Sequence, residues 1–248
     1  MSSTIKQAAY RTIREKLVSG EYPPGSRLSD DSIAREIGVS RSPVREAINQ
    51  FVSEGLVEYR PRCGTYVKSL SQRELDDLWG VRIALESFAA VDAIDSATRD
   101  DVESLVALNN ELLEVARACR ELPNQIASDN LKGEFLRIDS EFHLQMLRAA
   151  GNQHLLKIAL DCRLMTYIFG SRHAVLQITA DMLFQSQRDH ELILKAIRNS
   201  DRDNAREWMA NHIRSARSRV MAGDYQAVEK WKSDQQDCQQ KQRRRQSD

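Results

Sequence analysis

The sequence predicts a mainly α-helical protein in two parts: a small N-terminal region that combines helices with one β-hairpin, and a larger all-α bundle. Apolar residues recur at helical spacing through most of the 248-residue chain. Strand-like alternation is confined to two short segments, LVEYR and TYVKS, on either side of the turn PRCG. Helical spacing then continues from residue 71 with short interruptions, which favours a bundle of six or seven helices over residues 71–225.

Residues 1–70 begin with two predicted helices. In the first, an apolar residue recurs every fourth position from Ile5 to Leu17, and the segment SGEYPPGS ends the pattern. The second is the short segment SDDSIAREIG, in which Ser29 or Asp30 is the expected N-terminal cap and Gly38 the stop. A tight turn of three residues separates it from the next helical segment.

The third predicted helix, SRSPVREAINQFVSEG, completes a helix-turn-helix. Ser42 is its expected N-cap and Pro43 its first residue, where the missing N–H of proline costs nothing. Gly55 ends this helix, and the hairpin follows it as a wing with a basic tip. Helix, helix, turn, helix and hairpin is the order of elements in a winged helix-turn-helix domain.

Six later segments extend the helical pattern. Apolar stripes run from Leu75 to Ala89 and from Leu105 to Val115. The remaining helices are expected near 131–150, 153–169, 179–199 and 201–222. Residues 226–248 are rich in Gln and Arg and have almost no apolar side chains, so we expect this tail to be disordered.

Composition and charge narrow the class of protein. Apolar residues make up 41% of the chain and charged residues 29%, without an apolar run long enough for a membrane span and without a secretory h-region. The four cysteines include no C-x-x-C pair, which is typical of unpaired thiols in a reducing cytoplasm. Residues 1–70 hold 11 Lys and Arg against 8 Asp and Glu, whereas residues 71–225 hold 19 against 24. The N-terminal region of residues 1–70, the head, is thus basic, and the helical region of residues 71–225, the body, is acidic. This distribution indicates nucleic-acid binding at the N-terminal end.

The N-terminal motifs resemble a known family. PPGSRLSDDSIAREIGVSRSPVREAINQFVSEGLVEYRPRCGTYV is similar to the DNA-binding domain of GntR-family bacterial transcription regulators, with PG-x-x-L-S, GVSR-x-PVREA and EGLV in the family's order. Over residues 75–223 the motifs VR-x-x-LE and D-x-x-x-H followed by AGN, with late histidines, resemble the FCD effector domain of the FadR branch. The resemblance implies a cytoplasmic homodimer that binds a pseudo-palindromic operator and acts as a repressor relieved by a small-molecule effector.

The predicted recognition helix carries two arginines four residues apart, Arg41 and Arg45. An arginine fork can pair bidentately with guanine O6 and N7, and the resemblance assigns DNA contact to both positions. A solvated charged face is the alternative for these arginines. Further expected DNA contacts come from Ser40, Ser42, Arg62 and Gly64, the last allowing the wing to approach the DNA backbone.

Two residues of the head depart from the family pattern. Asp31 stands where many relatives carry a basic residue that touches DNA, and an acidic side chain there repels phosphate. Cys63 stands in the wing where arginine or lysine is frequent. The first departure predicts a lost contact or an altered specificity.

The stretch DSEFH places Asp139 and His143 on the apolar side of a helix. His190 and His212 also share faces with apolar residues of later helices. A divalent cation removes the cost of burying such groups, and the resemblance identifies these four as a metal site. Zinc is the expected ion, and nickel or manganese fit the same ligands. A metal-free hydrogen-bonded network is the alternative, and His154 and His173 fall outside the pattern.

An octahedral ion with four protein ligands leaves two positions for a small carboxylate effector. An arginine would meet its far end, with Arg82 as the first candidate and Arg163 as the second, and each is equally compatible with a structural salt bridge. Without an effector the metal would be purely structural. A zinc enzyme is not favoured, because HELIL at 190–194 has Leu194 where H-E-x-x-H needs its second histidine.

Overall fold

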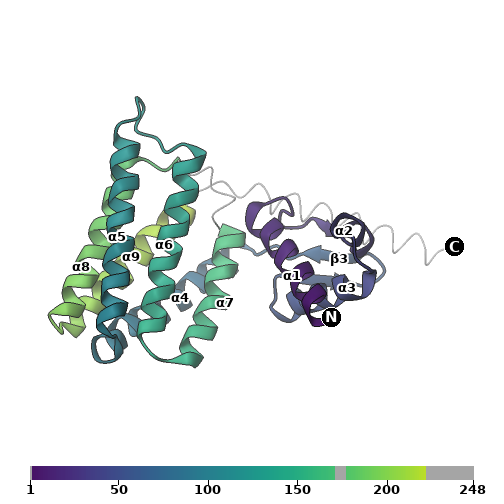
Figure 1. Cartoon of the computed structure of the whole chain (residues 1–248), viewed down its shortest axis with the longest axis horizontal. Coiled ribbons are helices and arrows are strands. Elements are labelled where there is room, and N and C mark those ends of the chain that lie inside the picture. The colour runs from purple at the N-terminus through teal and green to yellow at the C-terminus, as the bar shows by residue number, and fades with distance from the viewer. Residues whose placement is uncertain (1, 171–176, 222–248) are drawn as a thin grey trace. The chain divides into compact units, whose positions relative to one another are not determined.

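The computed structural model describes residues 2–170 and 177–221, with side chains from residue 5 onward. The chain divides into two compact units, one built mainly from the chain up to Leu75 and the other mainly from Asp76 onward (Figure 1). His173, Cys238 and the tail predicted at 226–248 lie outside the described residues.

Three helices form the core of the first unit: α1 (Ser2–Ser19), α2 (Asp30–Ile37) and α3 (Arg41–Ser53). Both α1 and α2 pack against α3, and Tyr10 stacks on Phe51 with ring centroids 4.4 Å apart. The apolar residues of α1 and α3 that meet are fully or almost fully buried: Ala9, Ile13, Leu17, Val44, Ala47, Ile48 and Phe51. Ile5, at the start of the α1 stripe, remains 41% exposed.

The caps of α2 are as predicted from the sequence, whereas the start of α3 differs from the prediction. Ser29 accepts a hydrogen bond from the backbone N–H of Ser32, and Gly38 ends α2 in the left-handed conformation with φ 74°. The predicted N-cap at Ser42 is wrong, since α3 begins at Arg41 with Ser40 as N-cap. Pro43 is therefore the third helical residue, a position whose N–H also lacks a partner within the helix.

The wing contains β2 (Val57–Arg60) and β3 (Gly64–Val67), which form the predicted antiparallel hairpin. A third strand, β1 (Arg27–Leu28), pairs with β3, so the strand order is β1-β3-β2. The sequence did not indicate β1, because two residues are too few to show alternation. Gly64 has φ 111°, and a Cβ there would lie 3.1 Å from Nε of Arg27.

The second unit is a helical bundle (Figure 1). Within it α5 packs against α6 and α8, and α8 packs against α9. An isolated β-bridge between Ile126 and Thr179 joins two connecting segments, where no strand was predicted. The described helices that follow the wing have these bounds: α4 (Gln72–Ser96), α5 (Arg99–Arg120), α6 (Asp129–Ala149), α7 (Gln153–Gly170), α8 (Ala180–Arg198) and α9 (Arg202–Met221).

Local signals account for where these helices begin. Thr98 and Asp101 form a reciprocal capping box at the start of α5. Ser128 and Thr179 cap α6 and α8 by accepting backbone N–H groups of the first turn. These caps set the register of α6 and α8, which carry three of the four predicted metal ligands.

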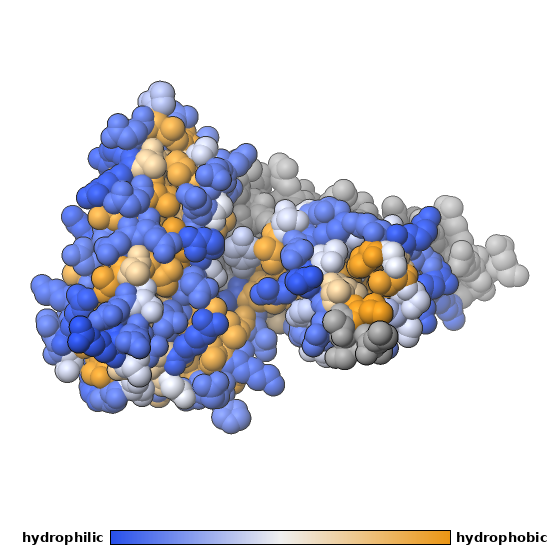
Figure 2. Space-filling view, in the orientation of Figure 1, coloured by the Kyte–Doolittle hydropathy of each residue, from blue (hydrophilic) through white to orange (hydrophobic). Residues whose placement is uncertain are grey.

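Among the residues that the structure describes, apolar clusters join helices of the bundle. One joins α5, α6 and α8 through residues that include Leu112, Ile138 and Leu183, and another joins α4, α6 and α7 through residues that include Ala89 and Leu147. Hydrophilic side chains cover most of the face seen in Figure 2, with hydrophobic patches between them. None of the helices that the structure describes combines the length and hydrophobicity needed to cross a membrane.

The cysteines agree in part with the expectation of unpaired thiols. Cys119 and Cys162 are free and buried. Burial raises the pKa of both thiols, so they are unreactive core residues. Cys63 in the wing is disulfide-bonded, which corrects the expectation for that residue.

Candidate metal centre and nucleic-acid interface

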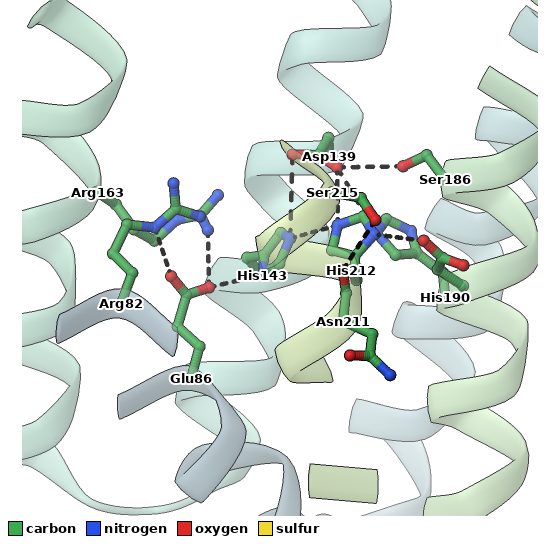
Figure 3. Close-up of polar contacts among 11 residues, drawn as sticks. Arg82, Glu86, Asp139, His143, Arg163, Ser186, His190, Asn211, His212 and Ser215 are labelled. Atoms are coloured by element: carbon green, nitrogen blue, oxygen red, sulfur yellow. Dashed lines mark hydrogen bonds and ion pairs between the residues drawn. The ribbon is translucent and has the colours of Figure 1, made fainter. Parts of the chain in front are cut away.

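Three helices bring the predicted ligand set together. Asp139 and His143 come from α6, His190 from α8 and His212 from α9, and one ligand atom of each lies within 4.8 Å of all the others (Figure 3). The three histidines are at most 3% exposed, whereas the Asp139 side chain is 24% exposed. The carboxylate therefore marks the side of the cluster that is open to solvent.

Helical spacing and packing aim these side chains. Asp139 and His143 are one turn apart on α6, so both project from the face that meets α8 and α9. Phe142, between them in sequence, stacks on the His190 ring with centroids 3.7 Å apart and planes within 2°. This stacking restricts rotation of the His190 ring.

The distances around Asp139 describe a compact group. Its Oδ1 lies 3.6 Å from Nε2 of His190 and 3.6 Å from Nε2 of His212, and its Oδ2 lies 4.0 Å from Nε2 of His143. Ser186 donates a hydrogen bond of 3.4 Å to Oδ1 of Asp139. Among the described residues, neither ring nitrogen of His190 has a hydrogen-bond partner, although the ring is fully buried.

Two further carboxylates contact the Nδ1 atoms of two of the histidines. Nδ1 of His143 lies 2.7 Å from Glu86, and Nδ1 of His212 lies 3.3 Å from Asp189. Because an ionised carboxylate only accepts hydrogen bonds, these contacts favour the tautomer with a proton on Nδ1 of each ring, although the His143–Glu86 contact lacks hydrogen-bond geometry. Each Nε2 is then directed at the centre of the cluster, where the two atoms lie 3.1 Å apart.

This arrangement fits a metal ion. Two facing nitrogen lone pairs repel unless a proton or a cation lies between them. Two ligands bound about 2.1 Å from one ion at right angles are about 3.0 Å apart, and opposite ligands about 4.2 Å apart. The observed separations, up to 4.8 Å, need only a small contraction to reach these values. A fully buried imidazole without a hydrogen-bond partner, such as His190, is a further feature that a metal bond would satisfy.

The pKa values of the cluster suit ligation. Burial lowers the pKa of His143 to about 4, and burial together with the charge of His212 lowers that of His190 well below its ordinary value. Burial also opposes charge on His212, but hydrogen bonds with Asp139 and Asp189 raise its pKa. Burial works against ionisation of Asp139, yet contact with His212 and the charges of the other histidines hold its pKa well below the usual range. The cluster thus offers an ionised carboxylate and two neutral imidazoles, His143 and His190, whereas His212 is held toward its protonated form and must release a proton to bind a divalent ion.

The two predicted effector arginines meet at one glutamate. Arg82 donates to Oε1 of Glu86 at 2.7 Å, and Arg163 donates to its Oε2 at 2.8 Å, the oxygen that also contacts His143 (Figure 3). Burial raises the pKa of Glu86, but the charges of Arg163 and Arg82 outweigh it and hold the pKa well below the ordinary value. The two arginines, Glu86 and the candidate ligand His143 therefore form one continuous network of ion pairs and close polar contacts.

Sequence reasoning missed three residues around the cluster. Glu86 stands four residues after Arg82 on the same helix face, a spacing that offered a signal. No sequence signal pointed to Asp189, because only the packing of α8 against α9 brings it close to His212. Arg219 lies two turns after His212 on α9; it is partly buried and has no hydrogen-bond or ion-pair partner among the described residues. Burial lowers its pKa, against the attraction of Asp139 and Asp189.

The predicted DNA-reading residues lie at the start of α3 and in the wing. The side chains of Arg41 and Arg45 are 59% and 65% exposed, which places both on a solvent-facing surface. Ser40, Ser42 and Arg62 are exposed as well, and Arg62 has φ 63°, at the tip of the wing. Each arginine of α3 is paired with an aspartate of α2, Arg41 with Asp31 and Arg45 with Asp30. The sequence did not indicate these pairs.

Comparisons with known proteins match both units. Residues 77–215 match the FCD domain family, and residues 5–67 match the bacterial regulatory proteins of the gntR family. The gluconate operon transcriptional repressor of Bacillus subtilis is 29% identical over 203 residues, which span 81% of this chain and 78% of the repressor. The HTH-type transcriptional repressor GlaR of Escherichia coli is 26% identical over 207 residues, 82% of this chain and 90% of GlaR.

Solved structures share the fold. E. coli McbR/YncC aligns with a TM-score of 0.71 and 21% identity, over 86% of this chain and 94% of that protein. A GntR transcriptional regulator from Rhodococcus sp. RHA1 aligns with a TM-score of 0.62 and 18% identity, over 88% of this chain and 98% of the other. At these identities the likeness shows the fold alone.

Proposed function

We propose a sensing mechanism for a chain that belongs to the GntR family of bacterial regulatory proteins and carries an FCD domain after its DNA-binding domain. The protein is a transcription regulator and not an enzyme, as both families and the named relatives are regulators. Relatives named as repressors support repression as its mode of action. Its place of action is the cytoplasm, where operator DNA is found.

The helical unit holds one divalent metal ion through Asp139, His143, His190 and His212. This proposal rests on the 3.1 Å distance between Nε2 of His143 and Nε2 of His212. Nδ1 of each of these rings faces a carboxylate, which leaves Nε2 directed at the proposed ion. Zinc is the expected ion, and nickel or manganese accept the same three nitrogens and one oxygen. Glu86 and Asp189 orient two of the rings from behind.

Loss of one ligand is expected to release the metal. Protein purified with one equivalent of bound metal should retain less than about a tenth of it after His143→Ala, because three remaining ligands bind far more weakly. Inductively coupled plasma mass spectrometry after dialysis measures the ratio. His154→Ala is the matched control, since His154 is exposed at the start of α7, and should retain the full amount. Equal metal content in the two variants, or none in the wild type, would exclude the site.

A small carboxylate is the proposed effector. The cluster opens on its Asp139 side, where the carboxylate is partly exposed, and an octahedral ion would still have two positions to fill. Arg82 and Arg163 are the proposed partners for the far end of the effector, if it displaces or shares Glu86. Arg219 is a third candidate, because it lies on the helix face of His212 and makes no hydrogen bond or close ion pair with a described side chain, although Asp139 and Asp189 attract it.

Effector binding is expected to stabilise the metal-loaded protein. A ligand at a hundredfold excess over its Kd adds about 2.7 kcal/mol to the free energy of unfolding. Thermal melts of metal-loaded protein over a panel of mono- and dicarboxylates should show a rise in Tm of several degrees for the effector class. The same panel with the His143→Ala variant is the control and should show no rise. If no carboxylate raises the Tm of the wild type, the metal is structural and the protein is a DNA-binding dimer without an effector.

Two copies of the chain are proposed to bind one pseudo-palindromic operator. A helix-turn-helix contacts half a site, so two heads are needed to read both halves. In the helical unit, Val81 and Phe88 are 42% and 48% exposed and stand seven residues apart on α4, a spacing that places them on one helix face. This face is the proposed contact between copies, and analytical ultracentrifugation of a Val81→Asp, Phe88→Asp variant tests it.

A further inference from the structure

The first turn of α2 places two carboxylates against the two arginines of the recognition helix. Asp31 contacts Nε of Arg41, and Oδ2 of Asp30 lies 2.9 Å from a terminal nitrogen of Arg45. All four side chains are substantially exposed, with the carboxylates at 45% and 31%. These contacts form on the surface that the proposed function directs at DNA.

Local structure sets both contacts. Ser29 caps α2, so Asp30 and Asp31 are its first two residues, and α2 packs on α3. Arg41 and Arg45 are one turn apart on α3, so each faces its own aspartate. Glu46, also exposed on α3, makes no ion pair among the residues that the structure describes. The two arginines therefore pair with the aspartates of α2 and not with the acidic residue of their own helix.

The pairs affect two kinds of DNA binding differently. Sequence-independent binding depends on positive charge that neutralises phosphates, and each carboxylate cancels one such charge at the groove. Base reading depends on N–H donors, and a guanidinium has five. Arg41 contacts its aspartate through Nε, and Arg45 contacts its aspartate through one terminal nitrogen. The remaining N–H groups of each guanidinium are left to donate to guanine O6 and N7. The carboxylates thus weaken attraction to any DNA more than they weaken reading of the right base.

We propose that Asp30 and Asp31 are specificity-determining residues. By pairing with Arg45 and Arg41, they weaken the binding of the head to DNA of any sequence and so increase its preference for the right sequence. The inference rests on the proposed DNA-reading role of the two arginines. The aspartates act through the arginines and are positioning residues, without a DNA contact of their own.

The test compares Asp31→Asn and the double variant Asp30→Asn, Asp31→Asn with Glu46→Gln, in the full-length protein. Glu46→Gln removes one negative charge from the same domain without freeing an arginine. Two fluorescent duplexes serve as probes: a mixed-sequence 30-mer and a 30-mer selected by the wild-type protein from a randomised pool. Affinities are measured by anisotropy between 50 and 200 mM salt, and thermal melts verify folding of each variant.

Asp31→Asn is expected to bind the mixed-sequence duplex about threefold tighter and the double variant about tenfold tighter. The preference for the selected duplex should fall by a similar factor, and the salt dependence should steepen by up to about one unit for each freed arginine. Glu46→Gln should change the preference by less than about twofold. An unchanged or weaker affinity of Asp31→Asn for the mixed duplex would overturn the inference.

A parallel measurement separates this inference from the proposed function. If Arg41→Ala binds both duplexes like the wild type, the arginine does not read DNA and the proposed function fails at this site. If Arg41→Ala loses binding while Asp31→Asn behaves like Glu46→Gln, only the inference about the aspartates fails. Because Ser29 still caps α2 in the single variant, Asp31→Asn decides the outcome even if the double variant unfolds.

Discussion

Replacement of Glu86 by alanine is expected to lower the free energy of unfolding of the helical unit by about 3–5 kcal/mol, the cost of removing one member of a buried charged network. Glu86 is 1% exposed and contacts Arg82, Arg163 and His143 at 2.7–2.8 Å. The variant deprives two buried cations of the carboxylate they share, and it also frees the ring of His143. Thermal denaturation followed by far-UV circular dichroism should show a Tm lower by about 10 °C.

A surface pair supplies the control for this prediction. Glu103→Ala breaks an ion pair of 2.7 Å between Glu103 and Arg99 on α5. The side chain of Arg99 is 89% exposed and that of Glu103 is 61% exposed. Water already screens such a pair, so the expected loss is below about 1 kcal/mol. If Glu86→Ala and Glu103→Ala cost the same, the network around Glu86 contributes no more than a surface contact, and its role in orienting His143 would be lost with it.

Replacement of Arg41 and Arg45 is expected to give the largest change in DNA binding. Each alanine variant should bind the selected duplex roughly tenfold to a hundredfold more weakly, because a bidentate arginine contact to guanine contributes about 1–3 kcal/mol of discrimination. Both side chains are more than half exposed, so neither truncation opens a cavity in the core. Anisotropy titration at fixed salt measures the affinity, and pools reselected with each variant should lose base preference at one position per half-site.

Arg11→Ala is the matched control for charge. Arg11 is exposed on α1, outside the turn that joins α2 to α3, and its removal should weaken binding less than about threefold. Equal losses for Arg11→Ala, Arg41→Ala and Arg45→Ala would mean that the head binds DNA through net charge alone. The recognition helix would then have no special role.

Much of the fold was predictable because its signals are local. The helix stop at Gly38, the cap at Ser29 and the hairpin around PRCG each depend on a few neighbouring residues, and the structure confirms them. The start of α3 was misplaced, since proline is tolerated at any of the first helical positions and does not single out one of them. Strand β1 exists only because β3 lies beside it, so no local pattern marks it.

The candidate metal site was predictable in its ligands but not in its surroundings. Asp139 and His143 share one helix face, and each later histidine shares a face with apolar residues, so their burial follows from helical periodicity. Glu86 and Asp189 reach their histidines from other helices, across 57 and 23 residues of chain. Periodicity says which way a side chain points and does not identify the partner it meets.

The sequence by itself determined a winged helix-turn-helix head, an all-α body and four candidate metal ligands on the inner faces of their helices, because capping residues and apolar spacing act within one or two turns of chain. Only the tertiary structure decided that Glu86 and Asp189 orient the histidines, and that Asp30 and Asp31 pair with the recognition arginines. Those contacts depend on how one helix is placed against another. That placement follows from packing across the whole core, which no short stretch of sequence encodes.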